Sequence, residues 1–398
     1  MENEPRGFAD IASNLIKRIQ ANLQTYALTI ALVLIWTFFA IVTNRGYATA
    51  QNFSNLFRQM TVTSFLAVGM VLVIVTGNID LSVGKLAGFA SVVVAHFQAK
   101  VWPDILPDQP ILTTALSVLI GLGTGSLIGA LQGYIIAYLN VPSFIVTLAG
   151  MWALNGAILL VTQGRTIPAN QPAFSQIAQG YLPNYAGWIV AAIVIGILFY
   201  SMFSGRRKKR RYGFELDPLY IDVMRTVLFS ILIVVYIYIV NLYNGAQVPV
   251  LLLALAAVAV SYMANNTRFG RYAYAIGGNR EAARLSGISI DKNVFQVFVL
   301  MGFLAGVSGV VLASYVGYGT IAAGDGYELD AIASCILGGT STLGGVGTIF
   351  GAMVGSLIMA SLSNGLQIMN VQAAWQYLVK GLVLVIAVYG DVYFKKNR

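Results

Sequence analysis

The chain has 398 residues, of which 58% are hydrophobic and 10% charged, and its mean hydropathy is +0.75. A soluble domain carries about 25% charged residues, so this composition excludes an ordinary soluble protein and indicates a polytopic membrane protein in a lipid bilayer. The net charge is +9, but the basic residues lie in short stretches between apolar runs, which indicates membrane topology and no nucleic-acid partner. Single Cys and His residues, Cys335 and His96, exclude an intrachain disulfide and a Cys- or His-based metal cluster.

Residues 1–25 are expected to form an amphipathic helix on the cytoplasmic membrane surface. Apolar residues recur there at helical spacing, with Lys17 and Arg18 off that stripe. A disordered tail is the alternative. The sequence opens with Glu2 and Glu4 rather than with a basic and then apolar leader, so no cleaved signal peptide is expected.

A helix needs roughly 20 apolar residues to cross a bilayer. By this criterion, residues 26–391 hold about twelve apolar runs that are candidate spans. The expected spans are Tyr26–Val42, Met60–Thr76, Leu81–Phe97, Ile111–Leu139, Phe144–Val161, Trp188–Phe203, Val227–Leu242, Val248–Met263, Val294–Val316, Leu329–Leu337, Ile349–Met369 and Tyr377–Tyr389. The run over residues 329–337 is the weakest because several glycines follow it. The sequence predicts an all-α bundle of 10–12 spans, with residues 392–398 as a short tail.

The distribution of basic residues predicts the orientation. With both termini in the cytoplasm, 18 of the 24 Lys and Arg residues fall in inner segments and 4 in outer segments. The basic run 206–211 then lies inside, as a topology anchor held by anionic lipid. Residues 163–187 lie outside, either as a solvated loop or as a surface for an extracytoplasmic partner.

Glycines within the spans recur at a spacing of four. Such series place bare backbone on one helix face, so that two helices can approach closely. They are Gly121, Gly125 and Gly129; Gly302 and Gly306; and Gly347, Gly351 and Gly355. A tightly packed bundle is therefore expected.

Two stretches, residues 77–95 and 339–360, resemble one another and interrupt apolar runs with glycines and small polar residues. Paired interruptions are the best sequence indication of a transport site built from broken helices, although chance similarity between Gly-rich segments is the alternative. The residues predicted to line the path or form the breaks are Asn78, Asp80, Ser82, Asn140, Ser143, Thr340, Ser341 and Thr342.

Asp80 lies at the junction of two apolar runs, where an ionised group is unfavourable unless it is paired or wet. It could line the path, but a cap or hinge role is favoured, since Asp80 or Ser82 could accept from the free N–H groups of the following helix. Lys85 is a candidate charge partner.

The inner loop over residues 264–293 contains a predicted short helix outside the bilayer. Gly277 and Gly278 permit a turn, Asn279 is a suitable N-cap, and Gly287 is a suitable stop. Because a helix this short is unstable alone, docking on a partner explains it better than solvation does. The docking residues are predicted to be Gly277, Gly278, Asn279, Arg280, Glu281, Ala282, Ala283, Arg284, Leu285, Ser286 and Gly287, with Ala282 and Ala283 at the contact.

Glu281-Ala282-Ala283 followed by Gly287 is similar to the EAA-x-x-x-G loop by which permeases of ATP-binding-cassette (ABC) importers dock on their ATPases. This motif and the sequences of residues 79–84 and 141–148 together resemble those of the ribose, xylose and arabinose permease family. The resemblance extends from about residue 52 to residue 389. Ribose-type members have about ten spans, whereas this chain adds a basic loop and an apolar helix over residues 205–243, which is more similar to xylose permeases.

The resemblance implies a homodimer of permeases in a bacterial inner membrane, two ATP-binding subunits and a periplasmic sugar-binding protein. ATP and Mg²⁺ would bind the partner ATPase, since the only Gly-Lys pair here, Gly84-Lys85, is not part of a phosphate-binding loop, and no cofactor is expected in this chain. An ion-coupled secondary sugar transporter is the alternative, but only Asp80, Lys85 and Lys380 approach intramembrane positions. The chain offers no nucleophile with its base, so it is not expected to be an enzyme.

Overall fold

The computed structural model describes residues 23–214, 216 and 218–396, so the amphipathic helix expected over residues 1–25 lies almost wholly outside the described part. The helices are α2 (Leu23–Val42), α3 (Ala50–Val75), α4 (Val83–His96), α5 (Trp102–Ile105), α6 (Pro110–Ala137), α7 (Ser143–Thr162), α8 (Pro172–Gln179), α9 (Asn184–Arg211), α10 (Leu219–Asn241), α11 (Val248–Asn266), α12 (Arg268–Gly278), α13 (Arg280–Leu285), α14 (Ile290–Val316), α15 (Tyr327–Leu337), α16 (Ile349–Ile368) and α17 (Ala373–Lys396). A π-helical turn, η1 (Phe97–Val101), joins α4 to α5, and the short strands β1 (Ile167–Pro168) and β2 (Tyr318–Gly319) pair antiparallel.

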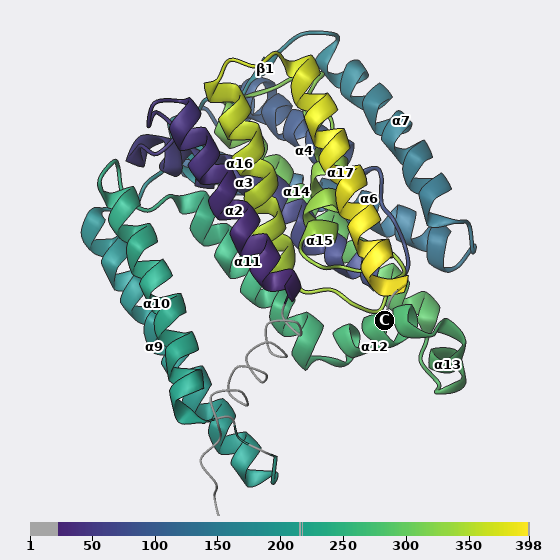
Figure 1. Ribbon diagram of the computed structural model, residues 1–398. Coiled ribbons are helices and arrows are strands. Elements are labelled where there is room, and N and C mark those ends of the chain that lie inside the picture. The colour runs from purple at the N-terminus through teal and green to yellow at the C-terminus, as the bar shows by residue number, and fades with distance from the viewer. Residues whose placement is uncertain (1–22, 215, 217, 397–398) are drawn as a thin grey trace, which may run out of the picture.

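Helices α3 and α14 form the centre of an all-α bundle (Figure 1). Both are buried over most of their length, as expected for helices that are apolar on every side. Helices α4, α6, α15 and α16 pack against this pair. Helices α7, α9, α10 and α17 lie at the periphery and expose large apolar side chains, as helices in contact with lipid do.

Each of the twelve expected spans coincides with a helix, and eight helices of the described chain are long and apolar enough to cross a membrane. Two of the helices at expected spans are too short to cross the bilayer alone. Helix α4 has 14 residues and α15 has 11, so at about 1.5 Å per residue they measure about 21 and 16 Å, less than the roughly 30 Å hydrocarbon core. The two runs are therefore broken helices, and η1 and α5 extend α4 at its C-terminal end.

Two connections are more ordered than predicted. The basic run 206–211 is not a loop but the last turns of α9, because Lys and Arg are good helix formers and complement the negative end of the helix dipole. The segment 163–187 is not simply solvated. It contains β1 and α8, and the Ser314 hydroxyl donates to the Phe174 carbonyl (2.8 Å) and accepts from the Ala178 N–H (3.0 Å).

The spaced glycines bring helices into backbone contact, as predicted. A Cβ at Gly125 of α6 would overlap the carbonyl oxygen of Gly302 in α14, and a Cβ at Gly302 would overlap the carbonyl oxygen of Gly125. In the same way, Gly355 of α16 lies against the backbone of Ser334 in α15. Because lipid offers no hydrophobic drive for helix association, this close van der Waals contact is a main source of cohesion in the bundle.

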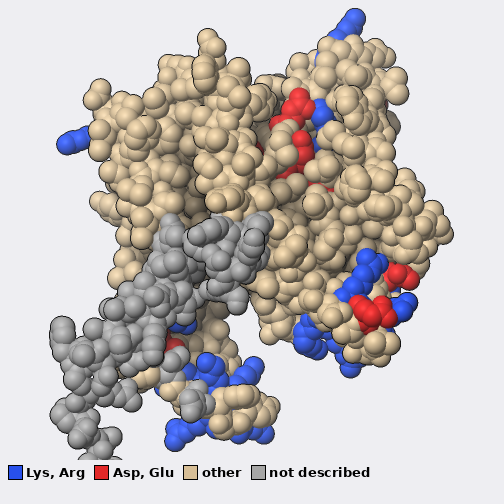
Figure 2. Space-filling view, turned by 45° about the vertical axis from the view of Figure 1, so that its right-hand side comes forward, with Lys and Arg blue, Asp and Glu red and all other residues tan. Residues whose placement is uncertain are grey.

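The two ends of the bundle differ in charge. One end holds the C-terminus, the turn between α9 and α10, and helices α12 and α13 (Figure 1). Figure 2 shows Lys and Arg gathered in two groups at this end, with only isolated basic side chains elsewhere on that face. The arrangement in space thus matches the asymmetry that the positive-inside rule requires.

We predict that Gly125→Leu destabilises the bundle, whereas Gly123→Leu does not. A side chain at residue 125 meets the α14 backbone, and overpacking of this kind costs about 1–3 kcal/mol. Residue 123 lies on the same helix, but a Cβ there meets nothing within 4 Å. The measurement is the thermal midpoint and the monodisperse fraction of each purified variant in detergent. Equal behaviour of the two variants would contradict the packing assignment.

Candidate coupling site and transport path

The predicted docking loop folds through local capping interactions. Asn279 precedes α13, and its Oδ1 accepts from the Ala282 N–H at 2.9 Å, which confirms the predicted N-cap. Gly287 has a φ of +78°, a conformation that glycine adopts most readily, which confirms the predicted stop. The helix itself ends at Leu285, and Ser286 is its C-cap.

Helix α13 presents charged and apolar side chains away from the bundle. Glu281 and Arg284 form an exposed ion pair at 2.8 Å, and the Leu285 side chain is 80% exposed. Ala282 is exposed, but Ala283 is only 4% exposed and belongs to the chain's own core. The expectation that both alanines lie at a partner contact is therefore wrong for Ala283, because the helix uses that face to anchor itself.

The loop is joined directly to the ends of the spanning helices. A Cβ at Gly277 would overlap the Val75 carbonyl at the end of α3, and the Gly345 N–H donates to that same carbonyl at 2.9 Å. The Tyr274 hydroxyl donates to the Gly347 carbonyl at 2.7 Å, and burial raises the pKa of Tyr274, so the hydroxyl keeps its proton. The loop thus contacts the 338–348 turn, between α15 and α16, without an intervening spacer.

The first predicted break is held by a chain of hydrogen bonds. Asp80 is 1% exposed, and its Oδ1 accepts from the Ser82 N–H (2.8 Å) and the Ser82 hydroxyl (2.7 Å). Gln132 of α6 donates its Nε2 to the Ser82 hydroxyl at 2.9 Å. The N-cap position of α4 is Ser82, whose side chain makes no capping hydrogen bond, so the expected cap by Asp80 or Ser82 on the helix N–H groups is wrong. Asp80 instead stabilises the turn that leads into α4.

The other predicted path residues divide into two groups. Near the first break, the Asn78 amide donates to the Thr76 hydroxyl (3.1 Å), and the Ser143 hydroxyl accepts from the Ile79 N–H (3.4 Å). Asn140 is exposed in the adjoining turn, with a φ of +54°. In the 338–348 turn, Thr340 and Ser341 are buried and Thr342 is exposed.

The sequence prediction missed the acidic partners of the intramembrane lysines. Lys85 forms an ion pair with Asp325, so it is not the partner of Asp80, and Lys380 contacts Asp330 at 2.8 Å. The carboxylate of Glu328 lies within electrostatic reach of Lys85. A signal for these residues was present, because a lysine within an apolar run requires a nearby acidic partner.

A bundle of spanning helices with broken segments and an exposed helical loop at its basic end defines a membrane transport permease. The chain belongs to the family described as branched-chain amino acid transport system / permease component, whose model matches residues 52–388. It is 42% identical to the xylose transport system permease protein of Escherichia coli K12, over 94% of this chain and 93% of that protein.

Two further relatives extend the comparison. The xylose transport system permease protein of Haemophilus influenzae is 41% identical, over 96% of this chain and all of that protein. The ribose import permease protein of Escherichia coli K12 is 34% identical, over 87% of each chain. No solved structure matches this chain.

We predict that Gly277→Ala impairs the permease, whereas the neighbouring Gly278→Ala is tolerated. The added methyl group at residue 277 would push the loop away from the Val75 carbonyl, whereas residue 278 has open space around its Cβ position. We expect Gly277→Ala to insert normally but to lose most sugar uptake in membrane vesicles. Wild-type uptake by the Gly277 variant would show that the close contact has no role in transport.

Proposed function

We propose that this chain is the membrane-spanning subunit of an ABC importer for a monosaccharide. The observation that carries the proposal is the capped, exposed helix α13. It directly follows α12, whose Gly277 and Tyr274 contact the end of α3 and the 338–348 turn. A six-residue helix has little stability of its own, so its rigid attachment to the bundle favours a role in passing force from a partner. The similarity to sugar permeases of known transport systems supports the same function.

The proposed complex has two copies of this chain, two ATP-binding subunits on the cytoplasmic side and a periplasmic sugar-binding protein outside. ATP and Mg²⁺ would bind the ATP-binding subunits, and this chain would catalyse no covalent reaction. Closure of those subunits would displace α13 and, through Gly277 and Tyr274, the 338–348 turn. Such a displacement would move the broken helix α15 and alternate access to the path.

D-Xylose is the favoured cargo. The two xylose permeases are 42% and 41% identical to this chain, and the Escherichia coli ribose permease 34%. The hairpin of α9 and α10, which includes the insertion expected over residues 205–243, supports the xylose-type assignment. The experiment is ATP-dependent uptake of labelled D-xylose by the reconstituted complex, with ribose and arabinose as competitors.

The alternative, an ion-coupled secondary sugar transporter, has no support among the relatives, which are subunits of transport systems and import permeases. The intramembrane charges also have a different explanation, because two of the three acidic side chains near Lys85 and Lys380 are neutralised in ion pairs. Uptake that continues in vesicles without ATP, but stops with a proton or sodium ionophore, would favour the alternative.

We predict that Ala282→Trp and Gly287→Val uncouple the complex while leaving the permease inserted. Tryptophan adds bulk to the exposed face of α13, and a β-branched residue at a positive φ is strained by about 1–3 kcal/mol, which would distort the end of the helix. The measurement is assembly with the ATP-binding subunit and ATP hydrolysis stimulated by the binding protein. Ala374→Trp, an exposed position at the start of α17 and at the opposite end of the bundle, is the matched control. Wild-type assembly and stimulation in both α13 variants would refute docking at α13.

We predict a cytoplasmic location for the end of α9 and for both termini. In a Cys335→Ser background, a cysteine at Lys208 should react with an impermeant thiol reagent only when the membrane is opened, because the positive-inside rule places the basic end in the cytoplasm. A cysteine at the exposed Asp108, at the opposite end, should react in intact cells. The reverse labelling pattern would invert the proposed topology.

A further inference from the structure

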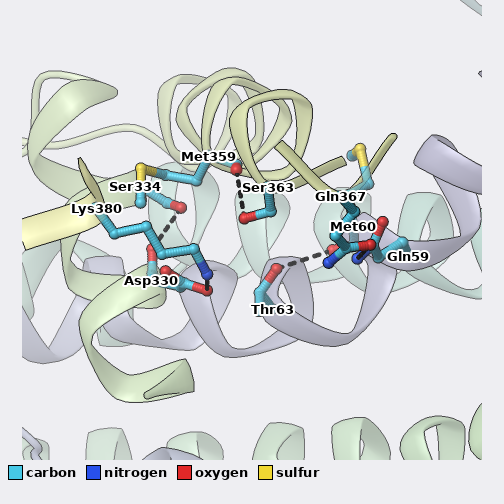
Figure 3. Close-up of polar contacts among 9 residues, drawn as sticks. All are labelled: Gln59, Met60, Thr63, Asp330, Ser334, Met359, Ser363, Gln367 and Lys380. Atoms are coloured by element: carbon cyan, nitrogen blue, oxygen red, sulfur yellow. Dashed lines mark hydrogen bonds and ion pairs between the residues drawn. The ribbon is translucent and has the colours of Figure 1, made fainter. Parts of the chain in front are cut away.

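Charged side chains gather midway between the two ends of the bundle. Figure 2 shows acidic side chains beside a basic one in a recess whose immediate surroundings are uncharged, apart from the basic groups at the end of the bundle. The charged residues in the first turns of the broken helices α4 and α15, in the link before α15 and on α17 form what we call the charged recess: Lys85, Asp325, Glu328, Asp330 and Lys380. Asp330 lies close to the level of Met359, the middle of α16 (Figure 3).

This recess is not a surface that hydrocarbon can cover. The Asp325 side chain is 44% exposed and that of Lys380 23% exposed. Each charged side chain near the centre of a membrane helix costs about 2.5–3.5 kcal/mol on insertion scales, so such residues face protein or water. The exposed side of the recess must therefore meet water or another protein copy.

The recess also has an unused hydrogen-bonding atom. The Lys85–Asp325 and Lys380–Asp330 pairs account for two of its three carboxylates. The Oε2 of Glu328 is buried and has no hydrogen-bond partner within the described part of the chain. It occupies space left by Gly84, where a Cβ would overlap it. An unsatisfied carboxylate oxygen at such a site is unfavourable unless water or a ligand donates to it.

A line of uncharged polar side chains continues from the recess. Thr63 follows Gln59 by four residues on α3, and Gln367 follows Ser363 by four on α16, so each pair lies on one helix face. Figure 3 shows these four side chains in one row with the Asp330–Lys380 pair. We call the four the polar stripe. At its outer end, the Gln59 and Gln367 amides are in contact at 3.3 Å and are solvent-exposed.

We propose that the polar stripe and the charged recess form one wall of the sugar path, with the second copy of this chain closing the other side. The inference rests on the function proposed above and adds the residues that face the solute. The stripe leads from the outer end of α16 to the middle of the bundle, where the first turns of α4 and α15 meet. It differs from the residues predicted from the sequence, which lie nearer the inner ends of the helices.

The chemistry of this wall fits a neutral, hydroxyl-rich solute. Amides, hydroxyls and carboxylates together donate and accept hydrogen bonds, as the hydroxyl groups of a monosaccharide require. The near-balance of two ammonium groups and three carboxylates attracts neither anions nor cations strongly. In the described part of the chain, no three His, Cys, Asp or Glu side chains are placed to hold a metal ion, so the wall offers no metal-ion site.

Cysteine accessibility in the assembled transporter tests the proposal. In a Cys335→Ser background, Gln59→Cys and Ser363→Cys should react with a small, hydrophilic, membrane-impermeant methanethiosulfonate reagent in the complex with its ATP-binding subunits. The control is Leu119→Cys on α6, which is 63% exposed and, like Gln59 on α3, lies nine residues after the first residue of its helix. We expect the stripe cysteines to react at least about tenfold faster than Leu119→Cys, because a thiol in hydrocarbon does not ionise.

Two further measurements show whether the polar stripe lines a water-filled path or forms a dry contact between the two copies. Added D-xylose should slow labelling of Ser363→Cys, and the double substitution Gln59→Leu with Gln367→Leu should lower D-xylose uptake while assembly with the ATP-binding subunit is retained. Unreactive stripe cysteines that instead form disulfides between the two copies would overturn the proposal and make the stripe a dry dimer contact. Failure of the wild-type chain to assemble with the ATP-binding subunits would count against the proposed function, not against the path.

Discussion

The hydrocarbon core of the membrane cannot hydrogen-bond, and this constraint governs the whole structure. Every polar group at that depth needs a partner within the protein, so the described spans are helical and their charges are turned inward or paired. The same constraint removes the hydrophobic drive between helices, and bare backbone contacts such as Gly125 on Gly302 replace it. A tight bundle and a few costly polar sites are two results of one solvent property.

Transport requires that some of this rigidity be broken at defined places. The start of α4 depends on Asp80, Ser82 and Gln132, which satisfy the backbone and one another where the helix cannot. The break after α15 differs, because the 338–348 turn contacts the docking loop. Gly345 lies against Gly277, and the Gly347 carbonyl accepts from the Tyr274 hydroxyl. The break before α4 is therefore fixed within the bundle, whereas the break after α15 contacts the docking loop, on which a partner would act.

The relatives and the structure contribute at different levels. Family membership and identity to xylose and ribose permeases define the class of transporter. The arrangement of side chains adds what similarity alone does not contain, namely which groups face outward from α13 and which residues surround Lys85 and Lys380. Leu285 and Glu328 stand out for physical reasons, the first as an exposed apolar side chain and the second as a buried oxygen without a partner.

Features set by neighbours along the chain were predictable from the sequence. The spans follow from runs of apolar residues, and the limits of α13 follow from Asn279 and Gly287, because capping acts over three or four residues. The bond between Asp80 and Ser82 is likewise local, since the two residues are two positions apart. Only the tertiary structure decided that Lys85 pairs with Asp325, that Ala283 is buried, and that α4 and α15 begin inside the bundle. These three features depend on which distant segments the glycine contacts bring together. Composition and periodicity do not indicate which segments become neighbours.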